Sequence, residues 1–219
     1  MNASEKRKQE KEEQKNARLN HILACTYELF SHGIETVTMN QIAQNAEIGV
    51  ASLYRYFSTK ELLAIECATY AWNIEEEKFK SAFDYKKYQK LNGYNQVKFS
   101  LEMFPKFFAT EGKFFRFIYY FDAFIKDKNV TPMQLTSYEA NIIRPEKVVI
   151  DAITKGKKDK SLNDFGAKEE ELFLTVTHAL FSMAQKLSLS GDMLYMDKTI
   201  SAENQMELLT EILLKSLKK

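Results

Sequence analysis

The sequence predicts an all-α fold, in which a small N-terminal three-helix domain precedes a larger helical domain. Glycine and proline are scarce, at 7 and 3 of 219 residues, whereas sandwiches and barrels need many turns that contain them. Apolar residues recur with helical spacing along most of the chain. Hydrophobic residues make up 45% of the sequence, enough for a sizeable core. We expect the domains to span residues 1–62 and 63–219.

Composition also restricts the class of protein. No run of about 18 apolar residues is present, and the N-terminus lacks the apolar core of a signal peptide. We therefore expect a cytoplasmic protein that does not enter a membrane, in which Cys25 and Cys67 are reduced thiols. The net charge of +1 means that any nucleic-acid binding must use placed contacts, since the bulk field is weak.

The first three helices follow from periodicity and caps. Residues 4–18 are nearly all charged or polar, which predicts a solvated tail or a frayed first turn of a helix. Regular apolar spacing starts at Leu19, and Gly33 is placed to end this helix. The sequence "TMNQ" is a capping box from Thr38 to Gln41 that opens a second helix. After the short gap at 47–49, a third helix is expected at 50–56.

The later helices are separated by clear breakers. "STKE" is a second capping box, and we expect Ser58 to cap a long fourth helix that passes Trp72 towards Phe79. Asn92-Gly93, Gly112, Thr131-Pro132, Gly156 and Gly191-Asp192 divide the rest. Pro145 should kink or split the helix that contains it. The expected helices are 94–110, 113–127, 133–156, 167–190 and 202–217.

The N-terminal motifs resemble those of the tetracycline-repressor (TetR) family of bacterial transcription regulators. The resemblance covers about residues 17–65 and rests on "LFSHG", "IA..A", "LYRYF" and the "KELL" that follows. It implies a helix-turn-helix that binds double-stranded operator DNA. Two positions depart from the family pattern: Glu47 stands where glycine is usual, and Gly49 where serine or threonine is usual. A left-handed Glu47 would cost about 1 kcal/mol, and Gly49 has no hydroxyl for a phosphate.

The residue types on the third helix suit its expected role. Leu53 and Phe57 can pack inward, while Tyr54 and Ser52 suit hydrogen bonds to phosphate. Arg55 can contact phosphate or read guanine, and helix N-termini attract phosphate. Residues 4–18 have a second interpretation as a basic arm on DNA, although their charges are of mixed sign. The expected DNA contacts are Thr38, Gln41, Val50, Ala51, Ser52, Tyr54, Arg55 and Lys60.

The larger half is rich in aromatic residues, above all in "FPKFFATEGKFFRFIYYFDAFI". Such a stretch is either an aromatic core or the wall of a site for an apolar or aromatic small molecule. An effector of unknown identity is the partner that the resemblance implies. The candidate ligand-binding residues are Trp72, Met103, Phe107, Phe117, Tyr120 and Phe124.

The last two helices carry apolar faces that are too wide to bury against a single neighbour. A homodimer of two-fold symmetry would cover them, as the resemblance also implies. The candidate interface residues are Phe173, Val176, Leu180, Met183, Leu209, Ile212 and Leu213.

An enzyme is the less favoured class. His21, His32 and His178 are scattered, and HExxH, CxxC, GxSxG and P-loop motifs are absent from the sequence. We expect no catalysis, no cofactor and no metal. The alternative to a ligand-released repressor is a ligand-independent chromosomal or division-linked DNA-binding factor of the same fold, which should lack a ligand cavity.

Overall fold

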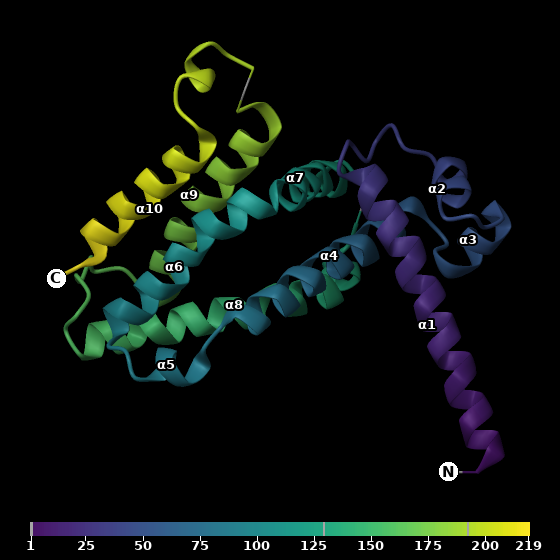
Figure 1. The fold of residues 1–219 in the computed structure, drawn as a ribbon, viewed down its shortest axis with the longest axis horizontal. Helices are drawn as coiled ribbons and strands as arrows, with labels where there is room; N and C mark the ends of the chain where they lie inside the picture. The colour runs from purple at the N-terminus through teal and green to yellow at the C-terminus, as the bar shows by residue number, and fades with distance from the viewer. Residues whose placement is uncertain (1, 129, 192) are drawn as a thin grey trace. The chain divides into compact units, whose positions relative to one another are not determined.

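The computed structural model describes residues 2–128, 130–191 and 193–219, with no side-chain description at residues 3, 82 and 141–145. Within these ranges the elements are helical (Figure 1), and the one β-type contact is an isolated bridge between Leu162 and Lys218. The elements are α1 (Ala3–Phe30), α2 (Met39–Asn45), α3 (Val50–Tyr56), α4 (Lys60–Ala82), α5 (Tyr85–Gln89), α6 (Gly93–Thr110), α7 (Gly112–Lys126), α8 (Pro132–Lys158), α9 (Glu169–Ser190), the 3-10 helix η1 (Met196–Lys198) and α10 (Ala202–Leu217).

The all-α prediction is confirmed, and the predicted helices in the second half agree with α6 to α10. Helix α8 runs unbroken through Pro145, so of the predicted kink or split the split does not occur. Two local predictions need correction. α1 starts at Ala3, so the charged segment 4–18 is helical rather than a tail. The hydroxyl that caps α4 is that of Thr59, which accepts from the Leu62 N–H at 3.2 Å, rather than that of Ser58.

The chain divides into two compact units that are each built from separate stretches. Unit 1 comprises residues 1–75 and 117–141, and unit 2 comprises residues 76–116 and 142–219. Helices α4, α7 and α8 each cross from one unit into the other. The division between residues 62 and 63 stays a prediction: it assigns DNA binding to residues 1–62 and ligand binding and dimerisation to residues 63–219.

The core of unit 1 holds the first three helices together. Apolar positions of α1, α2 and α3 are fully buried at Ile22, Ile42 and Leu53. On the far side of α1, the Tyr27 ring meets that of Phe117 from α7, with 5.0 Å between centroids. Burial of side chains this large contributes about 1.5–3 kcal/mol each, so tertiary packing, more than helix propensity, sustains the short helices.

Unit 2 is tied together at the ends of its helices. A Cβ at Gly93 would lie 2.0 Å from the Gly156 nitrogen, so the start of α6 touches the α8 backbone and only glycine fits there. The Gly93 N–H donates to an Asp159 carboxylate oxygen at 2.8 Å. Asn163 donates through Nδ2 to the Ser216 carbonyl at 2.6 Å, which attaches the end of α10 to the same loop region.

No helix in the described ranges is both long enough and apolar enough to cross a lipid bilayer.

Candidate functional site

Helices α2 and α3 are joined by a tight turn whose backbone is specified by hydrogen bonds. The Ile48 N–H donates to the Ala43 carbonyl at 2.9 Å, and the Glu47 N–H donates to the Gln44 carbonyl at 3.1 Å. Glu47 has a φ of +52°, the left-handed conformation that L side chains resist. The position therefore carries the backbone strain that the sequence predicts for a residue other than glycine.

Helix α3 presents most of its side chains to solvent. Only Leu53 is buried within it, at 0% exposure, and Phe57 packs directly after its end. Tyr54 is 49% exposed and Val50 is 38% exposed. Arg55 is also exposed, and its Nη2 donates to Ser52 Oγ at 2.8 Å, so one turn of helix orients the guanidinium. The inner side anchors α3, and the outer side is free for a partner.

The start of α2 is fixed by its capping box. The Gln41 N–H donates to Thr38 Oγ1 at 3.3 Å, and the Thr38 N–H donates to Gln41 Oε1 at 2.8 Å. Both side chains are exposed. The predicted box is confirmed, and it holds two polar side chains at a positive helix N-terminus, the arrangement that favours a phosphate.

Lys60 differs from the other candidates because its ammonium is engaged within unit 1. Nζ donates to the Glu35 carbonyl at 3.1 Å and lies 5.3 Å from the Phe124 ring centroid. Burial lowers the pKa of Lys60, and the Glu35 carboxylate opposes that shift. A phosphate contact would require this ammonium to leave Glu35, and its role on DNA stays a prediction.

Glu35 also joins the α1–α2 connection to the segment after α7. Its carboxylate accepts from Lys128 Nζ at 2.9 Å, and this hydrogen bond lowers the pKa of Glu35 while raising that of Lys128. Lys128 Nζ lies 5.0 Å from the Phe124 ring centroid. The Phe124 ring therefore lies near two cations, Lys60 and Lys128.

The four aromatic candidates in unit 1 have different environments. Phe117 is fully buried, so it belongs to the core. Trp72 is half-buried, and its Nε1–H donates to the Tyr138 hydroxyl at 3.3 Å. Burial, reinforced by the charge of Asp122, raises the pKa of Tyr138. The hydrogen bond from Trp72 acts in the opposite direction on this pKa, but burial outweighs it, so the phenol stays neutral.

Tyr120 and Phe124 line an open pocket of about 320 Å³. That volume lies at the lower end of the range for small-molecule sites. The opposite wall is the α1–α2 connection, which the sequence indicated only as a turn after Gly33. The lining residues are His32, Gly33, Ile34, Glu35, Thr36, Tyr120, Ala123, Phe124 and Asp127.

In unit 2 the aromatic residues pack on one another. Phe107 lies 5.1 Å from Phe115 and 5.4 Å from Phe114, measured between ring centroids. Phe115 in turn lies 5.2 Å from Phe181 of α9. Met103, on the same helix as Phe107, is half-buried. This arrangement is that of a filled aromatic core.

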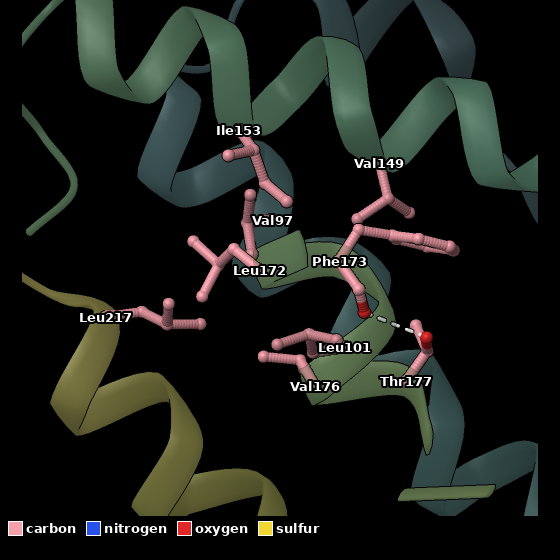
Figure 2. Close-up of a pocket in the computed structure, with 9 residues that line it drawn as sticks. All are labelled: Val97, Leu101, Val149, Ile153, Leu172, Phe173, Val176, Thr177 and Leu217. Atoms are coloured by element: carbon pink, nitrogen blue, oxygen red, sulfur yellow. Dashed lines mark hydrogen bonds between the residues drawn. The ribbon is translucent and has the colours of Figure 1, made fainter. Parts of the chain in front are cut away.

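A second cavity, between α6, α8, α9 and α10, is very small. Figure 2 shows nine side chains from these four helices converging on it, with the Thr177 hydroxyl donating to the Phe173 carbonyl at 2.8 Å. Its volume is about 10 Å³, room for at most one water. The lining residues are Val97, Leu101, Val149, Ile153, Leu172, Phe173, Val176, Thr177 and Leu217.

The candidate interface residues on α9 and α10 divide by burial. Leu180 is 0% and Val176 is 7% exposed, so both pack inside unit 2 rather than on its surface. Phe173, Met183, Leu209 and Leu213 are half-buried. Ile212 is 55% exposed, and Leu208, which the sequence reasoning did not select, is 57% exposed. An apolar strip on α10 thus remains uncovered.

Among the residues whose side chains are described, no group of three or more His, Cys, Asp or Glu could hold a metal ion. Neither Cys25 nor Cys67 is in a disulfide.

A family model matches the N-terminal part of the chain. Residues 22–67 match the family model described as "Bacterial regulatory proteins, tetR family". No curated protein sequence matches the chain.

Three solved structures illustrate the likeness in fold. A TetR-family transcriptional regulator from Agrobacterium tumefaciens is 12% identical, with a TM-score of 0.67 over 93% of this chain and 99% of that one. The fatty acid degradation regulator FadR from Bacillus halodurans is 13% identical, with a TM-score of 0.62 over 91% and 100%. The ketosteroid transcriptional regulator KstR2 of Mycobacterium tuberculosis is 13% identical, with a TM-score of 0.58 over 90% and 93%.

Proposed function

We propose that this chain, which carries the DNA-binding domain of the tetR family of bacterial regulatory proteins and has the fold of that family's transcriptional regulators, is a dimeric repressor. In this proposal it binds a palindromic operator on the bacterial chromosome, and an apolar or aromatic small molecule releases it. The observation that carries the proposal is the outer surface of α3, where polar and small side chains are exposed around a single buried Leu53.

Each polar or small side chain proposed to contact DNA has a chemical use on a duplex. Arg55 can form paired hydrogen bonds to guanine O6 and N7, the commonest specific contact in the major groove. Tyr54, Ser52, Thr38 and Gln41 suit phosphate oxygens, which position a protein without reading sequence. Val50 and Ala51 are small enough to bring the α3 backbone close to the bases. Lys60 would add a phosphate contact once it is released from Glu35.

Selection from a random duplex library tests DNA recognition directly. Purified protein should enrich a motif with two inverted half-sites, because two α3 helices related by a two-fold axis read the same sequence on opposite strands. Recovery of an asymmetric motif would contradict the palindromic operator. Failure to enrich any motif, by protein that is folded by circular dichroism, would contradict the proposed function itself.

The open pocket in unit 1 supports a response to small molecules. It lies between the α1–α2 connection and α7, so an occupant would touch the segment that leads to the Thr38 cap of α2. A ligand can shift an equilibrium only by its difference in affinity for two states. Binding that moves residues 32–36 supplies such a difference. Fatty acids and ketosteroids, which two of the similar structures are named for, are apolar, in keeping with the effector class proposed here.

A thermal-shift screen of apolar and aromatic compounds tests the effector. We expect a stabilising compound whose effect is lost in Tyr120→Ala but kept in Tyr119→Ala, since Tyr119 is exposed on the same helix and does not line the pocket. A hit that is insensitive to Tyr120→Ala would place the effector site elsewhere.

One observation favours the alternative, a ligand-independent DNA-binding factor. The aromatic rings of unit 2 contact one another, and the cavity between its helices has a volume of only about 10 Å³. A protein that binds many chromosomal sites without an effector needs no larger space. Operator binding that no compound in the screen alters would support this alternative.

A further inference from the structure

Helix α1 continues well beyond the segment that matches the family model. The match begins at residue 22, whereas the helix begins at Ala3. Residues 4–18 are exposed throughout, and Figure 1 shows this half of α1 running on past α2 and α3. Their one apolar side chain is Ala17, so the extension has no face that could build a coiled coil or enter a membrane interface.

The charges of this extension are sorted by side, although their signs alternate in the sequence. On a helix of 3.6 residues per turn, five basic residues fall within about 100° of arc, and the acidic residues fall outside it. We call these five residues the basic stripe. They are Arg7, Lys8, Lys11, Lys15 and Arg18. The acidic residues of the same segment are Glu5, Glu10, Glu12 and Glu13.

The basic stripe lies on the side of α1 that faces the helix-turn-helix. Continued along the helix, the same arc contains Ile22 and Cys25, and the Cys25 carbonyl accepts from Asn45 Nδ2 of α2 at 3.3 Å. The other side of α1 faces α4 and α7. There the Leu23 carbonyl accepts from the Cys67 thiol at 3.9 Å, and the Tyr27 ring meets Phe117.

Within the described part of the chain little neutralises the stripe. Lys15 lies 3.6 Å from Glu12, and both side chains of this ion pair are more than 60% exposed, so the pair is weak. The helical spacing places Arg7 beside Lys11 and Lys11 beside Lys15, four residues apart, where like charges destabilise a helix. A polyanion along this side would remove that repulsion.

We propose that the basic stripe binds the phosphate backbone of duplex DNA beside the segment read by α3. This inference rests on the proposed function and extends its interface by three turns of helix. The stripe is about 16 Å long, and a duplex carries one negative charge per about 1.7 Å of its axis. Its contacts are therefore electrostatic and independent of base sequence.

Salt dependence measures such contacts without knowledge of the operator. Fluorescence anisotropy of the full-length protein on a random-sequence duplex gives the slope of log K against log salt between about 50 and 200 mM. Each phosphate contact contributes about 0.9 to that slope. The triple variant Arg7→Gln/Lys11→Gln/Lys15→Gln should thus have a slope that is smaller by about 2.7. Lys6→Gln, on the other side of the helix, should keep the wild-type slope.

Exchanging two charges distinguishes the effect of the stripe on duplex binding from the effect of the protein's net charge. Lys11→Glu with Glu12→Lys leaves net charge unchanged but breaks the stripe, so it should weaken duplex binding and lower the slope. A wild-type slope in both the exchange and the triple variant, while Arg55→Ala still weakens binding to a selected operator, would overturn the stripe and leave the proposed function standing. No binding of wild-type protein to any duplex would overturn both.

Discussion

Replacement of Arg55 by alanine separates DNA recognition from folding. In the folded protein the exposed guanidinium makes one described contact, the hydrogen bond to Ser52 Oγ at 2.8 Å. Exposed contacts of this kind contribute little, so we expect the free energy of unfolding to change by less than about 0.5 kcal/mol. Loss of a base-reading arginine instead weakens specific binding by about 1–3 kcal/mol, or about 5- to 150-fold.

The assay is a gel-shift titration at fixed salt, on the duplex that wild-type protein selects from a random library. Tyr54→Phe removes one phenolic hydroxyl and should weaken binding less than Arg55→Ala does. Leu53→Ala is the matched contrast, because Leu53 is fully buried on the same helix and its truncation should lower stability by about 2–5 kcal/mol. Unchanged operator affinity in both Arg55→Ala and Tyr54→Phe would refute the assignment of the outer α3 surface to DNA.

Three further outcomes are expected. Sedimentation should find a dimer at micromolar concentration that Ile212→Asp dissociates, whereas Met133→Asp, at a still more exposed apolar position in unit 1, leaves it intact. A monomeric wild type would contradict the α10 interface. Glu47→Gly should raise the free energy of unfolding by about 1 kcal/mol, because glycine adopts the left-handed backbone without strain. Glu47→Ala keeps a Cβ and should not raise it. Equal effects of the two substitutions would show that the positive φ is not the cause of the change in stability. Calorimetry should find that operator DNA weakens effector binding by the same factor by which the effector weakens operator binding, with a coupling of about 1–3 kcal/mol. Equal effector affinity with and without operator would show that the pocket does not control DNA binding.

Local signals predicted most helix boundaries well. The box from Thr38 to Gln41 forms as its residue types require, and α10 begins where predicted because Ser201 caps its first turn by accepting from the Asn204 N–H. Periodicity failed where helices carry no apolar face. The exposed half of α1 looked like a tail for that reason, and the five-residue α5 was too short to show a period.

Contacts between distant segments could not be predicted from local pattern. Lys60 looked like a phosphate ligand at a helix N-terminus, but its ammonium is held by the Glu35 carbonyl, 25 residues away. Val176 and Leu180 share an apolar helix with surface positions, and only the packing of unit 2 reveals that both are interior. The wall at residues 32–36 likewise becomes part of a pocket only when α7 lies opposite.

Hydroxyl-radical footprinting on the selected duplex tests the central claim most directly. If two α3 helices of a dimer read the DNA, two protected stretches should appear with centres about 34 Å apart, one duplex turn, and both should disappear in Arg55→Ala. A footprint that is identical for wild-type protein and Arg55→Ala would contradict recognition through α3, and a single protected stretch at saturating protein would contradict a two-fold dimer on its operator.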